Sequence, residues 1–509
     1  MRGGAALLCG LLTLVAVPAA AQTPAATPTS VAPPVLAERA VDPIATGLAP
    51  VPGGLTPDEV GAVAARTRPS IRVKQAELRA AAARVDQAFA SFFPRVTGTA
   101  GYVRLSPLTL SFGNGALVGA KNEGALLVGT CPGVPAGGPQ CVVDSKGTPV
   151  GAQAFNLPVF LNQYTFQAQV AVPVSDYVLR LSQAYSAQSH GEKAKRLELE
   201  ALGLQEAADA KVAFYNWVRA RGGAIVAREA VAQAKAHLVD AKQTFEVGLL
   251  SKADVLRLEA QVAGAEQAEA EAGAYSALAE EQLRTVLGTG PEKPLAIGVD
   301  VMHETPEPPS ESLEAAQRMA FDRRVEIRAL DETEYSLKEV ESVARAGYLP
   351  RIDAFADAIY QNPNQRVFPA HDQFDFTWDV GARLTWVVND TFTAPANVAE
   401  ARARTEGVAQ QKQALRDGLR LEVASAYHDV PKSAVSIEAA ERGRTAAEES
   451  LRVRRELFRN GKATGVDIVD AETELTRARL NQLNARIGLH VARTRLAHAT
   501  GADAAAKGR

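Results

Sequence analysis

The chain has 509 residues, of which 47% are hydrophobic and only 6% aromatic, and its formal charge is −3. A charge this close to zero offers no basic surface of the kind that binds nucleic acid. The length allows two or three domains, and the alanine-rich, aromatic-poor composition suits long, closely packed helices better than a large aromatic core.

Residues 1–21 predict an export signal. Arg2 supplies the positive start, the apolar run Ala5–Val17 follows, and Ala19–Ala21 fits the small-residue cleavage pattern. The apolar run is too short to span a bilayer, and no later segment has 18 consecutive apolar residues. Residues 22–55 are rich in Pro and Ala without periodicity, so we expect a flexible lead-in to the folded protein.

Residues 56–290 predict one structural unit, in which the apolar period changes from helical to strand-like and back. Gln163–Val172 alternates apolar residues with Gln and Thr, as a two-sided strand does. The helix that follows could span about 105 Å, which requires neighbouring helices to bury its apolar stripe. The expected elements are a helix from Thr56 to about Phe92 with a break near Arg68-Pro69, a strand Val96–Arg104, a loop Leu105–Leu161, the strand Gln163–Val172, a cap at Pro173–Asp176, and helices Tyr177–Val247 and Lys252–Leu287.

Cys131 and Cys141 lie in that long Gly- and Pro-rich loop. In an exported chain an isolated cysteine pair favours a disulfide, with two free thiols as the alternative. A metal site would need more ligands than the loop offers, because no His occurs between Gly101 and Asn162.

After a Pro-rich connector at residues 291–310, residues 311–502 repeat the same order of elements. Val325–Arg328 corresponds to Pro69–Arg72, and Tyr348–Ile352 to Phe92–Val96, both at an offset of 256 residues. This agreement indicates an internal duplication. The expected elements are strands Arg351–Tyr360 and Phe374–Trp386, a long helix capped by Asn389-Asp390, kinked at Pro431 and ending near Arg459, a final helix to about Ala499, and a tail at residues 503–509.

Each unit contains one tight turn between two long helices, with the sequences FEVGLLSKADVLRLEA (Phe245–Ala260) and FRNGKATGVDIVDAET (Phe458–Thr473). A glycine ends the first helix, since it accepts the left-handed backbone conformation without a Cβ clash. Three residues later a hydroxyl residue can cap the next helix, with an acid at the capping-box position. The paired positions are Gly248 and Gly461, Ser251 and Thr464, and Asp254 and Asp467.

The strands carry apolar and aromatic residues on one side and Gln, Asp and Thr on the other. This pattern is typical of a membrane barrel with lipid outside and water inside, although a half-buried soluble sheet shows the same alternation. Four strands cannot close a barrel. Several copies of the chain would therefore share one barrel, since an open edge in lipid leaves backbone groups unpaired.

These features together resemble the TolC-like family of outer-membrane efflux and secretion channels. The motifs that carry the resemblance are Phe93-Pro94-Arg95 and Leu349-Pro350-Arg351 at the strand starts, Val172–Asp176, and above all the two turns. The resemblance implies an α+β membrane protein in which a homotrimer shares a twelve-stranded barrel and a long antiparallel coiled-coil tunnel. It also implies a periplasmic adaptor protein and an inner-membrane pump of the RND, ABC or MFS type as partners, with no cofactor.

In this family acidic residues of the second turn line the closed lower end of the tunnel, which places Asp467 and Asp470 at the aperture. Asp467 is equally well explained as a capping acid. The family links its two turns through a Tyr and an Arg on the second and an Asp on the first. Here the Asp is Asp254, but the other positions hold Phe458 and Ala463, and the neighbouring Lys462 is the candidate substitute.

The resemblance assigns adaptor docking to the tips of the two turns. Exposed apolar residues there would mark a partner surface, whereas leucines covering a helix end are the simpler interpretation. The tip residues are Gly248, Leu249, Leu250, Ser251, Gly461, Lys462, Ala463 and Thr464.

No sequence motif of an enzyme stands out, since the seven His form no H-E-x-x-H and no G-x-S-x-G or Walker pattern occurs. Together with this absence, the resemblance implies a passive exit duct that reaches from the outer membrane into the periplasm. The alternative is a soluble periplasmic coiled-coil scaffold. Efflux of small molecules and secretion of proteins are both left open.

Overall fold

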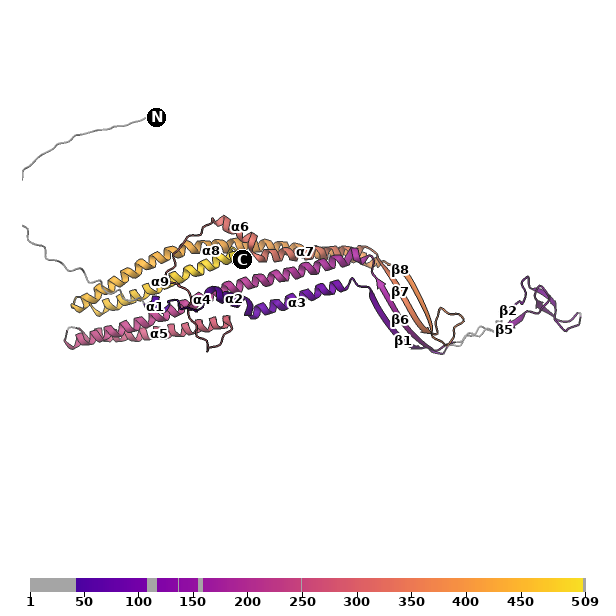
Figure 1. Cartoon of the computed structure of the whole chain (residues 1–509), viewed down its shortest axis with the longest axis horizontal. Coiled ribbons are helices and arrows are strands. Elements are labelled where there is room, and N and C mark those ends of the chain that lie inside the picture. The colour runs from indigo at the N-terminus through magenta and orange to yellow at the C-terminus, as the bar shows by residue number, and fades with distance from the viewer. Residues whose placement is uncertain (1–42, 108–116, 136, 154–158, 249, 507–509) are drawn as a thin grey trace, which may run out of the picture. The chain divides into compact units, whose positions relative to one another are not determined.

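The structure is a computed structural model that describes residues 43–107, 117–135, 137–153, 159–248 and 250–506. Residues 1–42, which include the expected signal and most of the lead-in, lie outside this range. The described elements run in the same order twice, as the duplication predicts (Figure 1). The first unit holds α2 (Pro57–Thr67), α3 (Pro69–Ala90), β1 (Arg95–Arg104), β6 (Asn162–Val172), α4 (Ser182–Glu246) and α5 (Lys252–Leu287); the second holds α6 (Leu313–Arg323), α7 (Val325–Arg345), β7 (Arg351–Asn362), β8 (Asp375–Thr385), α8 (Val388–Arg459) and α9 (Gly465–Ala499).

The four long strands form one antiparallel sheet in the order β1-β6-β7-β8. Strands of the two units meet at its centre, where Ala168 of β6 lies opposite Ala358 of β7. The expected strand limits are thus confirmed to within two residues at each end.

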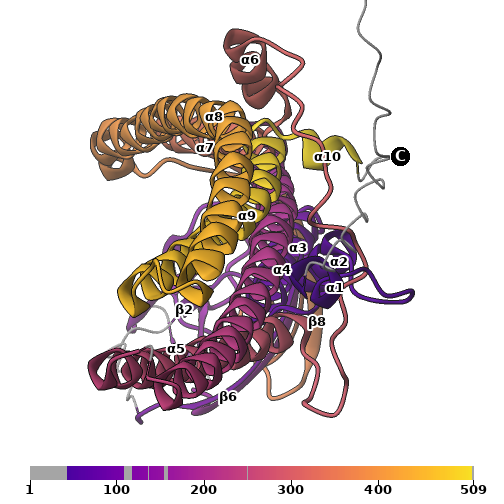
Figure 2. The ribbon, with the colours of Figure 1, turned by 90° about the vertical axis from the view of Figure 1, so that its left-hand side faces the viewer.

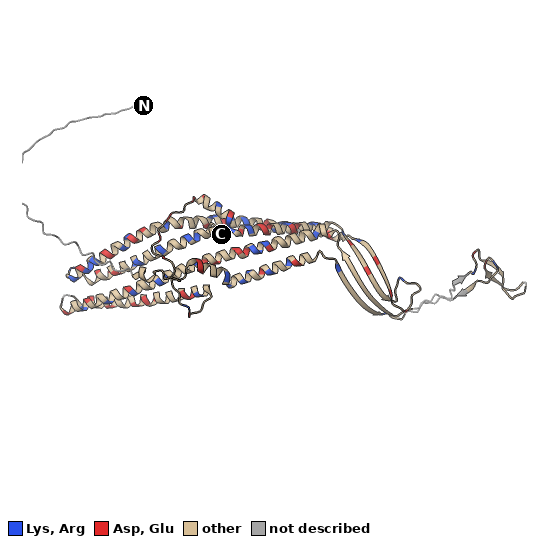
Figure 3. Ribbon diagram, in the orientation of Figure 1, with Lys and Arg blue, Asp and Glu red and all other residues tan. Residues whose placement is uncertain are grey.

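Two of the helices are far longer than a globular core requires. α4 has 65 residues and α8 has 72, which correspond to about 98 and 108 Å. α5 packs along α4, α9 packs along α8, and α9 also packs against α4. α8 continues as one helix through Pro395 and Pro431. In Figure 3 charged residues are spread along these helices, whereas the strands are mostly uncharged.

Two of the expected helix caps are wrong. Asp176 precedes a short π-helical turn, Tyr177–Leu181, but its side chain makes no capping bond. It instead faces Arg351 of the second unit, with Nη2 and Oδ2 3.1 Å apart. The second long helix begins at Val388 after an uncapped Val387, so that Asp390 lies within its first turn. A long-range ion pair thus replaces local capping at the first of these two helix starts.

A core cluster surrounds the middle of α4 and α9, and part of the expected lead-in belongs to it. Residues 43–55 are folded rather than flexible: Ile44 in a short helix, α1 (Pro43–Gly47), and Leu48 directly after it are each 1% exposed. These side chains pack with Phe214 and Trp217 of α4. Figure 2 shows α1, α2 and α10 (Ala502–Ala506) together on one side of α4 and α9, and we call this group, with the connector 291–310, the collar.

We expect Leu48→Ala to lower the free energy of unfolding by about 2–5 kcal/mol, because it leaves a cavity in that core. Denaturant unfolding of the purified protein measures the change. Val51→Ala is the matched control, since Val51 is half exposed in the same segment and should change stability by less than about 0.5 kcal/mol. Equal effects of the two substitutions would show that residues 43–55 do not contribute to the core.

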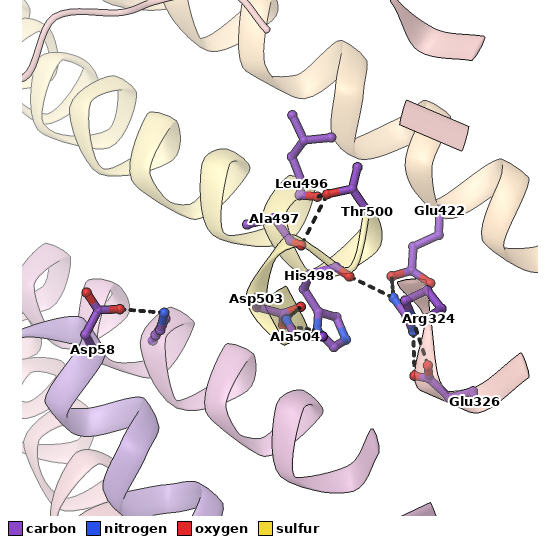
Figure 4. Close-up of polar contacts among 11 residues, drawn as sticks. Asp58, Arg324, Glu326, Glu422, Leu496, Ala497, His498, Thr500, Asp503 and Ala504 are labelled. Carbon is purple, nitrogen blue, oxygen red and sulfur yellow. Dashed lines mark hydrogen bonds and ion pairs between the residues drawn. The ribbon is translucent and has the colours of Figure 1, made fainter. Parts of the chain in front are cut away.

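Polar contacts fasten the second unit where α6 meets α7 (Figure 4). Arg324 is 8% exposed and donates to Glu326, to Glu422 of α8 and to the carbonyl oxygen of His498 on α9. The His498 ring lies 2.8 Å from Asp503. Residues 503–506 of the expected tail therefore belong to the helix α10 (Ala502–Ala506), held against the end of α9.

The segment between β1 and β6 contains two small two-stranded sheets instead of a plain loop. β2 (Leu117–Gly119) pairs with β5 (Gly151–Gln153), and β3 (Leu127–Thr130) pairs with β4 (Gln140–Val143). Cys131 and Cys141 are free thiols here, so the expected disulfide is absent from the structure. The two thiols lie close enough for a hydrogen bond with Cys131 to raise the pKa of Cys141.

Candidate functional site

The four-stranded sheet has two chemically opposite faces. Register places apolar residues of all four strands on one face, including Val96, Ala168, Ala358 and Trp378. The Trp378 side chain is 67% exposed on this face of the single chain. An apolar surface this broad is unfavourable in water, so we expect lipid or another protein to cover it. The opposite face carries Thr97, Thr99, Gln163, Thr165, Gln167, Gln169, Asp353, Asp357, Asp375, Thr377, Asp379 and Arg383.

Aromatic rings gather at both ends of the strands. At the end away from the helices, the ring centroid of Phe374 lies within 6.2 Å of the ring centroids of Tyr164, Phe166 and Tyr360. At the helix end, the Phe92 ring lies 6.0 Å from that of Tyr177. Aromatic girdles at the two ends of an apolar band are typical of barrels that cross a membrane.

The polar face is internally bonded. Asp357 is 8% exposed and accepts hydrogen bonds from Gln167 at 3.0 Å and Gln169 at 3.3 Å. The segment after β7 folds over this face, since Arg366 pairs with Asp379 at 3.3 Å and donates to the carbonyl oxygen of Trp378. Water and polar solutes would be compatible with such a surface, whereas lipid would not.

The two turns adopt the expected geometry. Gly248 and Gly461 have positive φ angles of 78° and 68°, which favours glycine over residues with a side chain. Ser251 accepts from the backbone N–H of Asp254 at 3.2 Å and caps α5. Thr464 and Asp467 form a complete capping box at the start of α9.

The two candidate aperture carboxylates differ in what they contact. Asp467 accepts from the N–H and the hydroxyl of Thr464 and lies 3.3 Å from Arg454 of α8. The Thr464 hydroxyl, the largest cause, lowers the pKa of Asp467. The stabilisation that the ionised carboxylate gives this cap is therefore fully present above about pH 3.9, the pKa of a free Asp. It is lost as the pH falls through the lowered pKa. Asp470 is exposed and makes no hydrogen bond or ion pair within the described chain.

We expect Asp470→Ala to weaken the block of single-channel current by divalent cations several-fold, because it removes the free carboxylate while leaving the helix cap intact. Recordings in planar bilayers with and without Mg²⁺ measure the change. Glu474→Ala is the control, since Glu474 is an exposed acid one turn further along α9. Unchanged conductance and unchanged block in Asp470→Ala would remove Asp470 from the aperture.

The turns meet within one chain through a different contact from the expected linkage. The Asp254 side chain lies against Gly465, so close that a Cβ on Gly465 would be 3.4 Å from its Cβ and Oδ1. No hydrogen bond or ion pair among the described residues joins Asp254 to Phe458 or Lys462. Phe458 is half-buried, and Lys462 is exposed.

A buried polar triad links the two units just above the turns. The Nε2 atom of His237 on α4 lies 2.7 Å from Glu472 of α9 and 2.9 Å from Arg455 of α8. His237 and Glu472 are 8% and 5% exposed. One ring nitrogen can donate to the carboxylate or accept from the guanidinium, but not both at once. The sequence offered one signal for this triad, which is a His and a Glu on the apolar stripes of long helices.

The tip residues are placed as follows. Gly248, Ser251, Gly461, Lys462 and Thr464 are exposed, and Leu250 and Ala463 are half-buried. Leu249 lies outside the described residues. The half-burial of Leu250 leaves both the docking and the end-covering interpretations open for that residue.

The chain is similar to one protein family and to several solved structures. The family described as outer membrane efflux protein matches residues 322–502, which is most of the second unit. No curated protein matches the chain. Three solved structures with this fold are CusC (15% identity, TM-score 0.70, covering 89% of this chain and 92% of CusC), the Campylobacter jejuni CmeC outer membrane channel (16%, 0.68, 87% and 85%) and the open state of the Neisseria gonorrhoeae MtrE outer membrane channel (16%, 0.66, 87% and 88%).

Proposed function

We propose that the chain belongs to the outer membrane efflux protein family, whose model matches residues 322–502, and that it is the outer-membrane exit duct of a tripartite efflux system. In this proposal a homotrimer joins three four-stranded sheets into one closed barrel, with the aromatic face toward lipid. The long helices of α4, α5, α8 and α9 form the periplasmic tunnel. The observation that carries the proposal is the combination of a two-sided sheet with helices of about 100 Å in one chain.

The proposed duct is passive. Substrates pass along the polar face of the sheet and the tunnel, while energy comes from an inner-membrane pump. The tips around Gly248 and Gly461 are the proposed docking surface for a periplasmic adaptor, and Asp467 and Asp470 are the proposed aperture ring.

Purification and electrical recording test this function. The protein should need detergent, migrate as a trimer and form conducting pores in planar bilayers. A monomer that stays in the aqueous fraction would contradict the proposal. Deletion of the gene, followed by screens with drugs, metals and secreted proteins, then identifies the class of substrate.

A further inference from the structure

A polar cavity of about 300 Å³ lies between α4, α8 and α9, away from both the sheet and the turns. Its charged lining residues are Arg219, Asp429, Lys432 and Arg495. Lys432 pairs with Asp429 at 3.6 Å, so these two charges cancel. Arg219 and Arg495 have no ion pair within the described residues, and the cavity therefore carries a net charge of about +2, from three cations and one anion.

Arg219 is the unusual residue of this cavity, because its side chain is unpaired in the described part of the chain. Its Nε atom is buried and has no hydrogen-bond partner among the described residues. Burial, the largest cause, lowers the pKa of this guanidinium, and the charge of Arg495 acts in the same direction. A buried guanidinium donor without an acceptor costs free energy, which an anion in the cavity would recover.

Part of the cavity lining lies on the side of α9 that faces away from the connector 291–310. His490 contacts the carbonyl oxygen of Val301 in the connector, and Arg493 pairs with Glu304 there. Gly488 and Arg495, each two residues away, line the cavity instead. Residues two apart on a helix point about 200° apart, so the connector 291–310 and these two cavity residues lie on opposite faces of α9. In Figure 2 the helices of the collar, α1, α2 and α10, lie to the right of α4 and α9.

We propose that this cavity is an anion-binding station on the inner wall of the duct, selective for solutes that carry a carboxylate, phosphate or sulfonate group. The location on the inner wall rests on the proposed function, because in a tunnel the face away from the collar is the one that lines the passage. The two guanidiniums supply the planar, charged donors that such groups bind. Polar neighbours, Asn216, Ser433 and Asn484, supply further hydrogen bonds.

Calorimetric titration of the full-length, detergent-solubilised protein with inorganic phosphate tests the site. The wild-type protein should bind phosphate saturably, and Arg219→Gln/Arg495→Gln should bind it at least about tenfold more weakly. Arg495→Gln alone covers the case in which the double variant fails to fold, because Arg495 is exposed, and it should lose part of the affinity. Arg420→Gln is the control, since Arg420 is an exposed arginine of α8 outside this cavity, 3.8 Å from Asp417.

The absence of saturable binding to the wild-type protein, or equal binding by the arginine variants, would overturn the proposal. A partner subunit's carboxylate filling the cavity would also abolish binding and count against it. Current recordings on the same preparation keep the two proposals separate. If the protein forms conducting pores but does not bind phosphate, only the anion-binding proposal fails. If it binds phosphate but forms no pores, the exit-duct proposal fails and the anion site stands.

Discussion

Ala168→Arg is expected to prevent assembly of the protein in the outer membrane. Ala168 lies near the middle of β6 on the apolar face, opposite Gly98 and Ala358. A guanidinium at the midplane of a barrel costs about 2–4 kcal/mol per copy, and a trimer would carry three of them. We expect the variant to leave the detergent-dependent trimer and to be degraded or to aggregate, which membrane fractionation and native electrophoresis measure.

Gln167→Arg is the matched control for this prediction. It introduces the same side chain one residue earlier in the same strand, but on the polar face beside Asp357, which already accepts from Gln167. An arginine there can keep a bond to that carboxylate in a wet environment, so assembly should be normal. Equal assembly of the two variants would show that the aromatic face does not contact lipid.

His237→Ala is expected to loosen the end of the helix bundle near the turns. The substitution leaves Glu472 without its 2.7 Å partner in a site where it is only 5% exposed. Leaving a buried polar group without its partner costs about 1–3 kcal/mol. We therefore expect faster hydrogen exchange in residues 230–246 and 465–475, together with a larger mean conductance.

Two further variants make this prediction specific. Lys242→Ala, on the same helix as His237, removes an exposed pair with Glu259 of α5 and should cost less than about 1 kcal/mol. His237→Ala/Glu472→Ala removes both members of the buried pair and should recover part of the lost protection, since no carboxylate is then left unpaired. If His237→Ala exchanges no faster than Lys242→Ala, the triad does not hold the two units together.

Much of the fold could be predicted because local patterns specify it. The period of two in Gln163–Val172 and the period of 3.6 in the long helices fix backbone conformation and the face of each side chain. Gly248 and Gly461 fix the turns because their backbone conformation excludes most other residues. The same information separated the two faces of the sheet, and with them the expected lipid and water sides.

The sequence by itself thus determined the duplicated order of elements, the sidedness of the strands and the capped turns, since each depends on residues within a few positions of one another. Only the tertiary structure decided that Leu48 is buried, that Asp176 pairs with Arg351, that Arg219 lines a cavity and that His237 meets Glu472. These contacts join segments far apart in the chain. They depend on how the long helices are rotated against one another, which no local periodicity specifies.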